Sequence, residues 1–298
     1  MTSLIATDPT DATTAADATP AGRVRGPRWG RRVIVGTSVT ILAVVAVFAL
    51  VPGLVATHGP TVTDLSAVGQ GPSAAHWFGT DQLGRDIFSR VVYGARLSLL
   101  IGVVSTVIGA SIGGLLGLLA GYAGGAVDAF LMRFVDVMLA IPGIMLALVI
   151  IAVRGPGTVN LVIAIGVGAI PEYARLMRGQ VRSIRQRPFM EAAVAAGSRA
   201  HVLIFRHLLP NAISPLLVLA TIGIGVSILV ASGLSFLGLG PRPPEAEWGS
   251  MLADARDYAA DFWWMTTFPG LAIVATVVAV NIVGQHLRGR VERREDSR

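Results

Sequence analysis

Six runs of mostly apolar residues dominate this sequence, and each is about long enough to cross a lipid bilayer as a helix. They are residues 33–56, 97–120, 127–153, 159–177, 213–239 and 262–283. The hydrocarbon core of a bilayer is about 30 Å thick and requires roughly 20 helical residues. Because lipid offers the backbone no hydrogen bonds, spanning segments must be helices or a closed barrel. The sequence therefore predicts an all-α integral membrane protein whose six transmembrane helices form one domain, residues 33–287.

The composition agrees with lipid as the main solvent and excludes several chemistries. Only 14% of the residues are charged, whereas a soluble domain carries about 25%. The chain has no cysteine, and none of its 24 basic residues is lysine. A thiolate site, a lysine Schiff base and a phosphate-binding GxxxxGK[ST] loop are therefore impossible. If ATP drives this protein, another chain must hydrolyse it.

Arginine clusters predict the topology. They lie before the first apolar run, between Arg175 and Arg206, and after the last run. The positive-inside rule places all three in the cytoplasm, and with them both termini. Residues 1–32 are predicted to form a disordered cytoplasmic tail and residues 288–298 a second cytoplasmic tail. The net charge of +6 thus flanks the membrane and does not indicate nucleic-acid binding.

Two of the predicted spans carry informative residues. Gly109, Gly113 and Gly117 recur every four residues in the second span, a spacing that allows close approach of another helix in lipid. In the third span, Arg133 and Asp136 share one helix face. We favour an ion pair at the cytoplasmic end of that helix over a polar lining for a transport path. The proline and glycine at positions 142 and 143 should bend the same span.

An arginine-rich insert, residues 179–211, separates the fourth and fifth spans and contains the stretch MEAAVAAGSRAHVLIFRHLLPN. Pro188 can open a short helix, the alanines make it slim, and Gly197 can end it in the left-handed conformation. A second short helix should follow and end at Pro210. The insert is either a docking element for a partner's groove or a loop whose arginines fix topology.

The polar stretch before the second span contains four charged residues at helical spacings, Asp81, Arg85, Asp86 and Arg90. We favour an ion-pair network that caps the second span. The alternative is a contact with another protein at the outer mouth. No histidine is paired with a carboxylate at helical spacing, so the sequence predicts no metal site.

The insert also carries a recognisable signature. Glu191-Ala192-Ala193, Gly197 and Leu209-Pro210 match the EAA motif of permease subunits of ATP-binding-cassette importers. His207 stands where the general motif has isoleucine, a departure that looks like the peptide-importing branch. Residues 76–99, 121–142 and 232–252 resemble the same branch, in the same order. The chain thus resembles the second permease of dipeptide and oligopeptide importers, although its first 22 residues have no counterpart.

The resemblance implies a type I ABC importer permease fold in a bacterial cytoplasmic membrane. The expected partners are a homologous second permease in a heterodimer, ATP-binding-cassette ATPase subunits and an extracytoplasmic substrate-binding lipoprotein. ATP and magnesium would bind to the ATPases, and this chain would hold no cofactor and have no enzymatic site. The resemblance places coupling to the ATPase on Glu191, Ala192, Ala193, Gly197, Ser198, Arg199, His207, Leu209 and Pro210.

The expected cargo is short peptides, and relatives with similar permeases leave nickel chelates or haem as alternatives. A more remote alternative is a secondary transporter or channel that works without an ATPase. That class would be expected to show charged residues deep in several spans or an inverted repeat. The sequence shows neither feature clearly.

Overall fold

The computed structural model describes residues 28–295, and within them the chain is almost entirely helical. The helices are α1 (Arg28–Leu50), α2 (Pro52–Val55), α3 (Ile87–Ala123), α4 (Gly125–Leu139), α5 (Gly143–Arg154), α6 (Thr158–Arg185), α7 (Pro188–Ala195), α8 (Ala200–Val202), α9 (Leu209–Phe236), α10 (Trp248–Ala255) and α11 (Trp263–Glu295), with short 3-10 turns η1 (Leu65–Ala67) and η3 (Arg256–Tyr258) and a π-helical segment η2 (Leu203–Leu208). Five helices are long and apolar enough to span a membrane, and the pair α4–α5 makes a sixth if it counts as one span.

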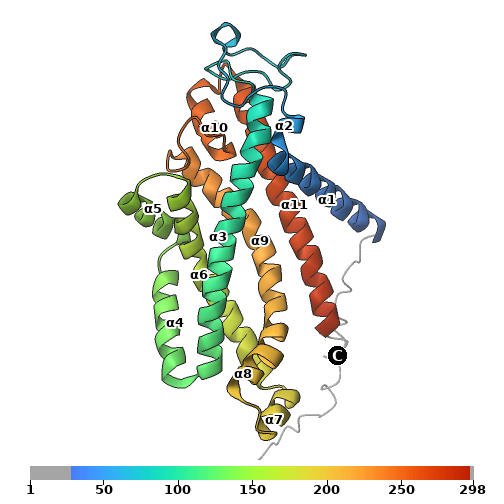
Figure 1. Ribbon diagram of the computed structural model, residues 1–298, viewed down its shortest axis with the longest axis vertical. Helices are drawn as coiled ribbons and strands as arrows, with labels where there is room; N and C mark the ends of the chain where they lie inside the picture. Colours follow the sequence, from blue (N-terminus) through green and yellow to red (C-terminus); the bar gives the residue numbers. More distant parts are fainter. Residues whose placement is uncertain (1–27, 296–298) are drawn as a thin grey trace, which may run out of the picture.

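The long helices α3, α6, α9 and α11 run along the long axis of the molecule, as Figure 1 shows. The α4–α5 pair flanks α3 and α6 on one side, and α1 packs against α11 and α3 on the other. One end carries α10 and the segment between α2 and α3, and the opposite end carries α7 and α8. Functional residues at these two ends are therefore separated by the full length of the helices.

The tightest helix pair, α3 with α6, depends on the glycines predicted to allow close approach. A Cβ atom added at Gly113 would lie 2.4 Å from the carbonyl oxygen of Ile170, and one added at Gly117 would lie 2.2 Å from that of Ala174. These separations are far below van der Waals contact, so only glycine lets the two backbones approach so closely. The predicted packing of this span inside the bundle is confirmed.

Several helices have other bounds than the predicted spans. Helix α3 begins ten residues before the predicted second span, because Asp86 caps it by accepting a hydrogen bond from the Ser89 amide. The third span is broken into α4 and α5, which meet at 85°. The bend lies at Pro142 and Gly143, where the sequence placed it, but it is too sharp for one continuous helix.

The ends of the domain also differ from the prediction. Of the predicted tail, residues 1–32, residues 1–27 lie outside the described part of the chain. Residues 28–32 already belong to α1. At the other end α11 continues to Glu295, past the predicted boundary at residue 287, because the sequence there is rich in strong helix formers. Residues 296–298 of the predicted tail lie outside the described part of the chain.

Candidate functional site

Helix α7 forms the tip of the molecule at one end of the bundle (Figure 1). Pro188 occupies its first turn, as predicted. The helix ends at Gly197, which has a φ of 74°. The Ser198 amide donates to the Ala193 carbonyl at 3.1 Å and the Gly197 amide to the Val194 carbonyl at 2.9 Å. This pair of bonds is a Schellman motif and requires the left-handed conformation that glycine adopts without strain.

One buried side chain anchors α7 to the membrane helices. Met190 is only 3% exposed and belongs to a cluster with Met177 of α6, Leu208 of η2 and Leu216 of α9. Ala193, one turn further along, packs at the edge of the same cluster. Since protein interiors are close-packed and transmit displacement, a movement of α7 would reach both α6 and α9.

The rest of the surface of α7 is open. Glu191 and Ala192 are exposed, and Phe189 and Val194 present apolar side chains that are 41% and 58% exposed. Exposed apolar side chains and a carboxylate on a slim helix form a surface that suits a partner's groove. The motif residues Glu191 and Ala192 contribute to this surface, whereas Phe189 and Val194 lie outside the matched motif and were missed.

The remaining motif residues lie beyond the tip. Gly197 and Arg199 are exposed and Ser198 is half-buried in the turn after α7. His207 is half-buried in η2, where its ring lies 6.4 Å from that of Phe189. Leu209 and Pro210 open α9 rather than belonging to the exposed surface of α7.

The second helix of the insert was predicted to end at Pro210, and this was wrong. Residues 200–236 form one continuous helical run through η2 into α9. Pro210 has no amide proton and cannot donate a backbone hydrogen bond to the preceding turn. That turn adopts π-helical spacing, so the chain continues as a helix without this bond. The Asn211 side chain donates to the His207 carbonyl at 2.7 Å, which satisfies one backbone group in this region.

Ion pairs between α4 and α6 lie in the half of the molecule that carries α7. Asp128 accepts hydrogen bonds from Arg178 and Arg182, each at 2.5 Å. Asp136 pairs with Arg175 at 2.7 Å. The predicted pair between Arg133 and Asp136 is therefore replaced by a pair between two helices, because α6 packs against α4.

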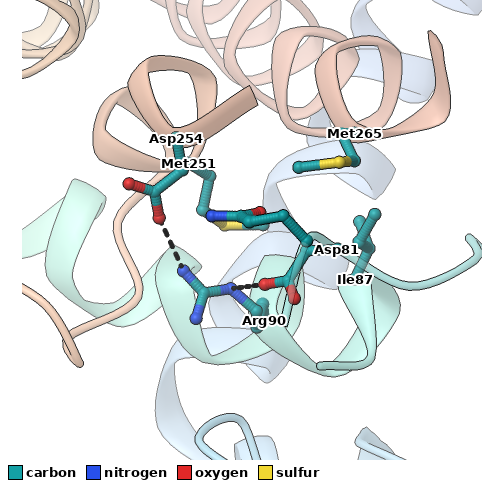
Figure 2. Close-up of a pocket in the computed structure, with 7 residues that line it drawn as sticks. Asp81, Ile87, Arg90, Met251, Asp254 and Met265 are labelled. Carbon is teal, nitrogen blue, oxygen red and sulfur yellow. Dashed lines mark hydrogen bonds and ion pairs between the residues drawn. The ribbon is translucent and has the colours of Figure 1, made fainter. Parts of the chain in front are cut away.

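At the other end of the bundle, the predicted charged residues are buried together. Asp81, Arg85 and Arg90 are each less than 5% exposed. Asp81 lies 2.6 Å from Arg85 and 3.7 Å from Arg90. Asp254 of α10 completes the network at 3.6 Å from Arg85 and 3.5 Å from Arg90, and Figure 2 shows Arg90 between the two carboxylates. This geometry agrees with the favoured ion-pair network, and its partner from α10 was not predicted.

A small cavity with a volume of about 10 Å³ lies beside Arg90, and Figure 2 shows the side chains that line it. The cavity is lined by Asp81, Gln82, Ile87, Arg90, Met251, Asp254 and Met265. Burial raises the pKa of Asp254, although the two guanidinium groups lower it in part. The network holds the start of α3 against α10.

Asp86 does not join that network. Besides capping α3, its carboxylate lies 3.0 Å from Nδ1 of His76 and 3.9 Å from Nδ1 of His58. The two imidazole rings are 4.9 Å apart. These three residues lie far apart in the sequence at no regular spacing, so no sequence pattern predicted that they would meet.

A buried carboxyl group begins α10. Glu247 is 1% exposed and accepts hydrogen bonds from the amides of Gly249 and Ser250, both at 2.8 Å. Burial raises the pKa of Glu247 above its ordinary value. The next residue, Trp248, is fully buried and donates from its indole nitrogen to the Val91 carbonyl of α3 at 2.9 Å.

Comparison with known proteins identifies the family. Residues 113–296 match the model of binding-protein-dependent transport system inner membrane components. The probable D,D-dipeptide transport system permease protein of Escherichia coli (strain K12) is 44% identical over 252 residues, covering 85% of both chains. The dipeptide transport system permease protein of Alkalihalophilus pseudofirmus is 43% identical and covers 85% of this chain and 83% of its own. The glutathione transport system permease protein of Pectobacterium atrosepticum is 41% identical, with coverage of 88% and 87%.

Solved structures support the same fold. The MetNI methionine ABC transporter in an inward-facing conformation matches with a TM-score of 0.55 and 20% identity, covering 68% of this chain and 96% of its own. An amino acid ABC transporter with histidines matches with a TM-score of 0.52 and 18% identity, covering 70% and 95%. Because the family model covers more than half of the chain and the relatives exceed 40% identity, the protein belongs to the family of binding-protein-dependent transport system inner membrane components.

Proposed function

We propose that this chain is the membrane-spanning permease subunit of an ATP-driven importer that carries short peptides into the cell. The observation that carries the proposal is the 41–44% identity, over at least 85% of the chain, to permeases named for D,D-dipeptides, dipeptides and glutathione. These names favour peptides over the alternative cargoes, nickel chelates and haem. ATP and magnesium bind to separate ATPase subunits, and this chain holds no cofactor.

In this proposal the end of the bundle with α7 faces the cytoplasm, together with both termini. The arginine clusters support that orientation. The opposite end, with α10 and residues 57–86, faces outward and receives cargo from a substrate-binding lipoprotein. A homologous but distinct permease supplies the other half of the pore.

The coupling step rests on the exposed and the buried side chains of α7. The exposed side chains, which include Glu191, Phe189 and Val194, lie in a cleft of one ATPase subunit. Its buried residue, Met190, joins the cluster that includes α6 and α9. Closure of the ATPases on ATP displaces α7, and the close-packed cluster passes that displacement to the membrane helices.

The first experiment is co-purification with the neighbouring gene products, using a tag on this chain. We expect an ATPase with a Walker A loop and a second permease to purify with it. A preparation that never contains such an ATPase contradicts the proposal and favours a transporter or channel that works alone.

The second experiment separates transport from ATP hydrolysis. Glu191→Arg and Gly197→Val should insert normally and leave the complex able to hydrolyse ATP, while uptake of a radiolabelled dipeptide is lost. Asp261→Arg is a charge-reversal control at the opposite end of the bundle. Gly124→Val imposes the same backbone strain, since Gly124 also has a positive φ and nothing near its Cβ position.

Normal dipeptide uptake in both α7 variants contradicts the coupling role. The cargo is tested in a strain that lacks this chain. If dipeptide uptake is unchanged there while uptake of a nickel chelate or haem is lost, the peptide assignment is wrong.

A further inference from the structure

We propose that His58, His76 and Asp86 form a zinc site at the end of the molecule opposite α7. The sequence predicted no metal site, because these residues occupy three separate segments. His58 follows α2, His76 lies in the connection to α3, and Asp86 immediately precedes α3. The fold brings one potential ligand atom from each of the three to within 4.8 Å of the others.

The distances suit a small tetrahedral ion. Zinc binds imidazole nitrogen and carboxylate oxygen at about 2.0–2.2 Å, so neighbouring ligand atoms in a tetrahedral site lie about 3.4 Å apart. Nδ1 of His76 lies 3.0 Å from Oδ1 of Asp86, and Nδ1 of His58 lies 3.9 Å from Oδ2. These two separations, to different oxygens of Asp86, lie on either side of the required one. All three ligand atoms lie within 4.8 Å of one another, so a movement of His58 by up to about 1.4 Å would close the site.

The burial of the three side chains indicates how the site would work. The Asp86 side chain is 1% exposed and fixed by the Ser89 amide, so it provides a rigid ligand. The His76 side chain is 14% exposed, and that of His58 is 42% exposed and borders solvent. Metal therefore enters from the solvent side, and water supplies the fourth ligand.

The donor set favours zinc over other biological cations. Calcium and magnesium prefer six or more oxygen ligands, whereas the side-chain oxygens here are the Asp86 carboxylate and the weak hydroxyls of Thr57 and Ser89. Two imidazoles with one carboxylate and one open position match the ligand sets of zinc sites. The Nδ1 proton that His76 shares with Asp86 in the metal-free site moves to Nε2 when metal binds, since a metal-bound nitrogen carries no proton.

The bound ion would hold three parts of the outer segment together. Residues 57–86 contain no long helix. Near Asp86, single hydrogen bonds join the start of this segment to α3, such as that from the His58 amide to Ser89 Oγ at 3.0 Å. A metal that links His58 and His76 to the first residue before α3 cross-links this segment to the bundle. The proposed zinc ion would thus cross-link the surface that faces away from α7.

The test uses the full complex, purified through a tag without histidine and reconstituted in nanodiscs. After treatment with a chelator, the complex is titrated with zinc chloride by calorimetry, and its metal content is measured by elemental mass spectrometry. His58→Ala and His76→Ala are the test variants, and His201→Ala, an exposed histidine beside α7, is the matched control. Asp86 is left intact because it also caps α3.

We expect each test variant to contain one zinc ion fewer per copy of this chain, or to bind it at least about tenfold more weakly. His201→Ala should bind zinc like the unchanged protein. Cobalt in the same site should show the intense visible bands of tetrahedral Co²⁺, and both test variants should lose them. His58 is exposed, so His58→Ala keeps the test valid even if His76→Ala fails to fold. Equal zinc content and affinity in the unchanged protein and in His58→Ala overturn the site.

Discussion

Replacement of Gly117 by alanine should separate α3 from α6 and destabilise the bundle. An added Cβ would lie 2.2 Å from the Ala174 carbonyl oxygen, 2.8 Å from Cβ of Met177 and 2.9 Å from the Arg178 amide nitrogen. Ordinary contact begins at about 3.4 Å, so the closest pair must move apart by about 1.2 Å. Backbone atoms and a Cβ cannot rotate away, and the helices themselves must therefore shift.

The size of the effect follows from two opposing contributions. Overpacking without rotamer relief costs up to about 3 kcal/mol. Alanine in place of glycine favours the helix by up to about 1 kcal/mol. The net loss is about 2 kcal/mol, which corresponds to a fall of roughly 4–8 °C in the midpoint of thermal unfolding for a protein of this size.

The measurement compares two glycines on the same pair of helices. Gly179 lies within α6, is exposed and has nothing within 4 Å of a built Cβ, so Gly179→Ala gains helix propensity without a clash. Thermal midpoints in nanodiscs should fall for Gly117→Ala and rise by a few degrees for Gly179→Ala. If Gly117→Ala is as stable as Gly179→Ala, then backbone contact does not hold α3 against α6 and the reasoning is refuted.

Three further perturbations test other parts of the structure. Asp81→Asn leaves the buried Arg85 and Arg90 without their shared carboxylate and should lower the free energy of unfolding by about 3–5 kcal/mol. Among these variants it should show the largest fall in thermal midpoint. A loss below about 1 kcal/mol would contradict the network. Burial raises the pKa of Glu247, so the folded state holds the proton of this carboxyl group more tightly than the unfolded chain does. The free energy of unfolding should therefore decrease as the pH rises from about 4.5 through the raised pKa. Glu247→Gln cannot ionise and should flatten that part of the midpoint-against-pH curve, and an unchanged slope would exclude Glu247 as its source. Met190→Ala should lower the free energy of unfolding by about 2–4 kcal/mol, because it leaves a cavity. It should also lower dipeptide uptake more than ATP hydrolysis, because α7 loses its anchor. Equal losses of both activities would count against the anchor.

Local sequence rules worked where a single segment determines its own structure. Length and hydropathy identified the helices that can span a membrane, since in lipid a helix must satisfy its own backbone. Pro188 and Gly197 marked the two ends of α7, because proline suits a first turn and a positive φ at a helix end favours glycine. The bend at Pro142 was predicted for the same reason, although its angle was not.

The same rules failed where a neighbouring element changes what is stable. Residues 87–96 look too polar for a membrane helix, yet Arg90 is buried because Asp81 and Asp254 neutralise it, and α3 therefore starts at Ile87. Pro210 was expected to end a helix, but the π-helical turn before it allows the helix to continue. Arg175 replaced the predicted partner of Asp136 because α6 packs against α4.

The sequence by itself determined that this chain is helical, that it crosses a membrane about six times, and which segment carries the EAA motif. These properties follow from composition, periodicity and a contiguous motif, and each is written within one stretch of chain. Only the tertiary structure decided that Met190 ties α7 to α6 and α9, that Asp254 completes the buried network, and that His58, His76 and Asp86 meet. Contacts between residues far apart in the chain have no sequence spacing to reveal them, because the tertiary fold alone sets their distances.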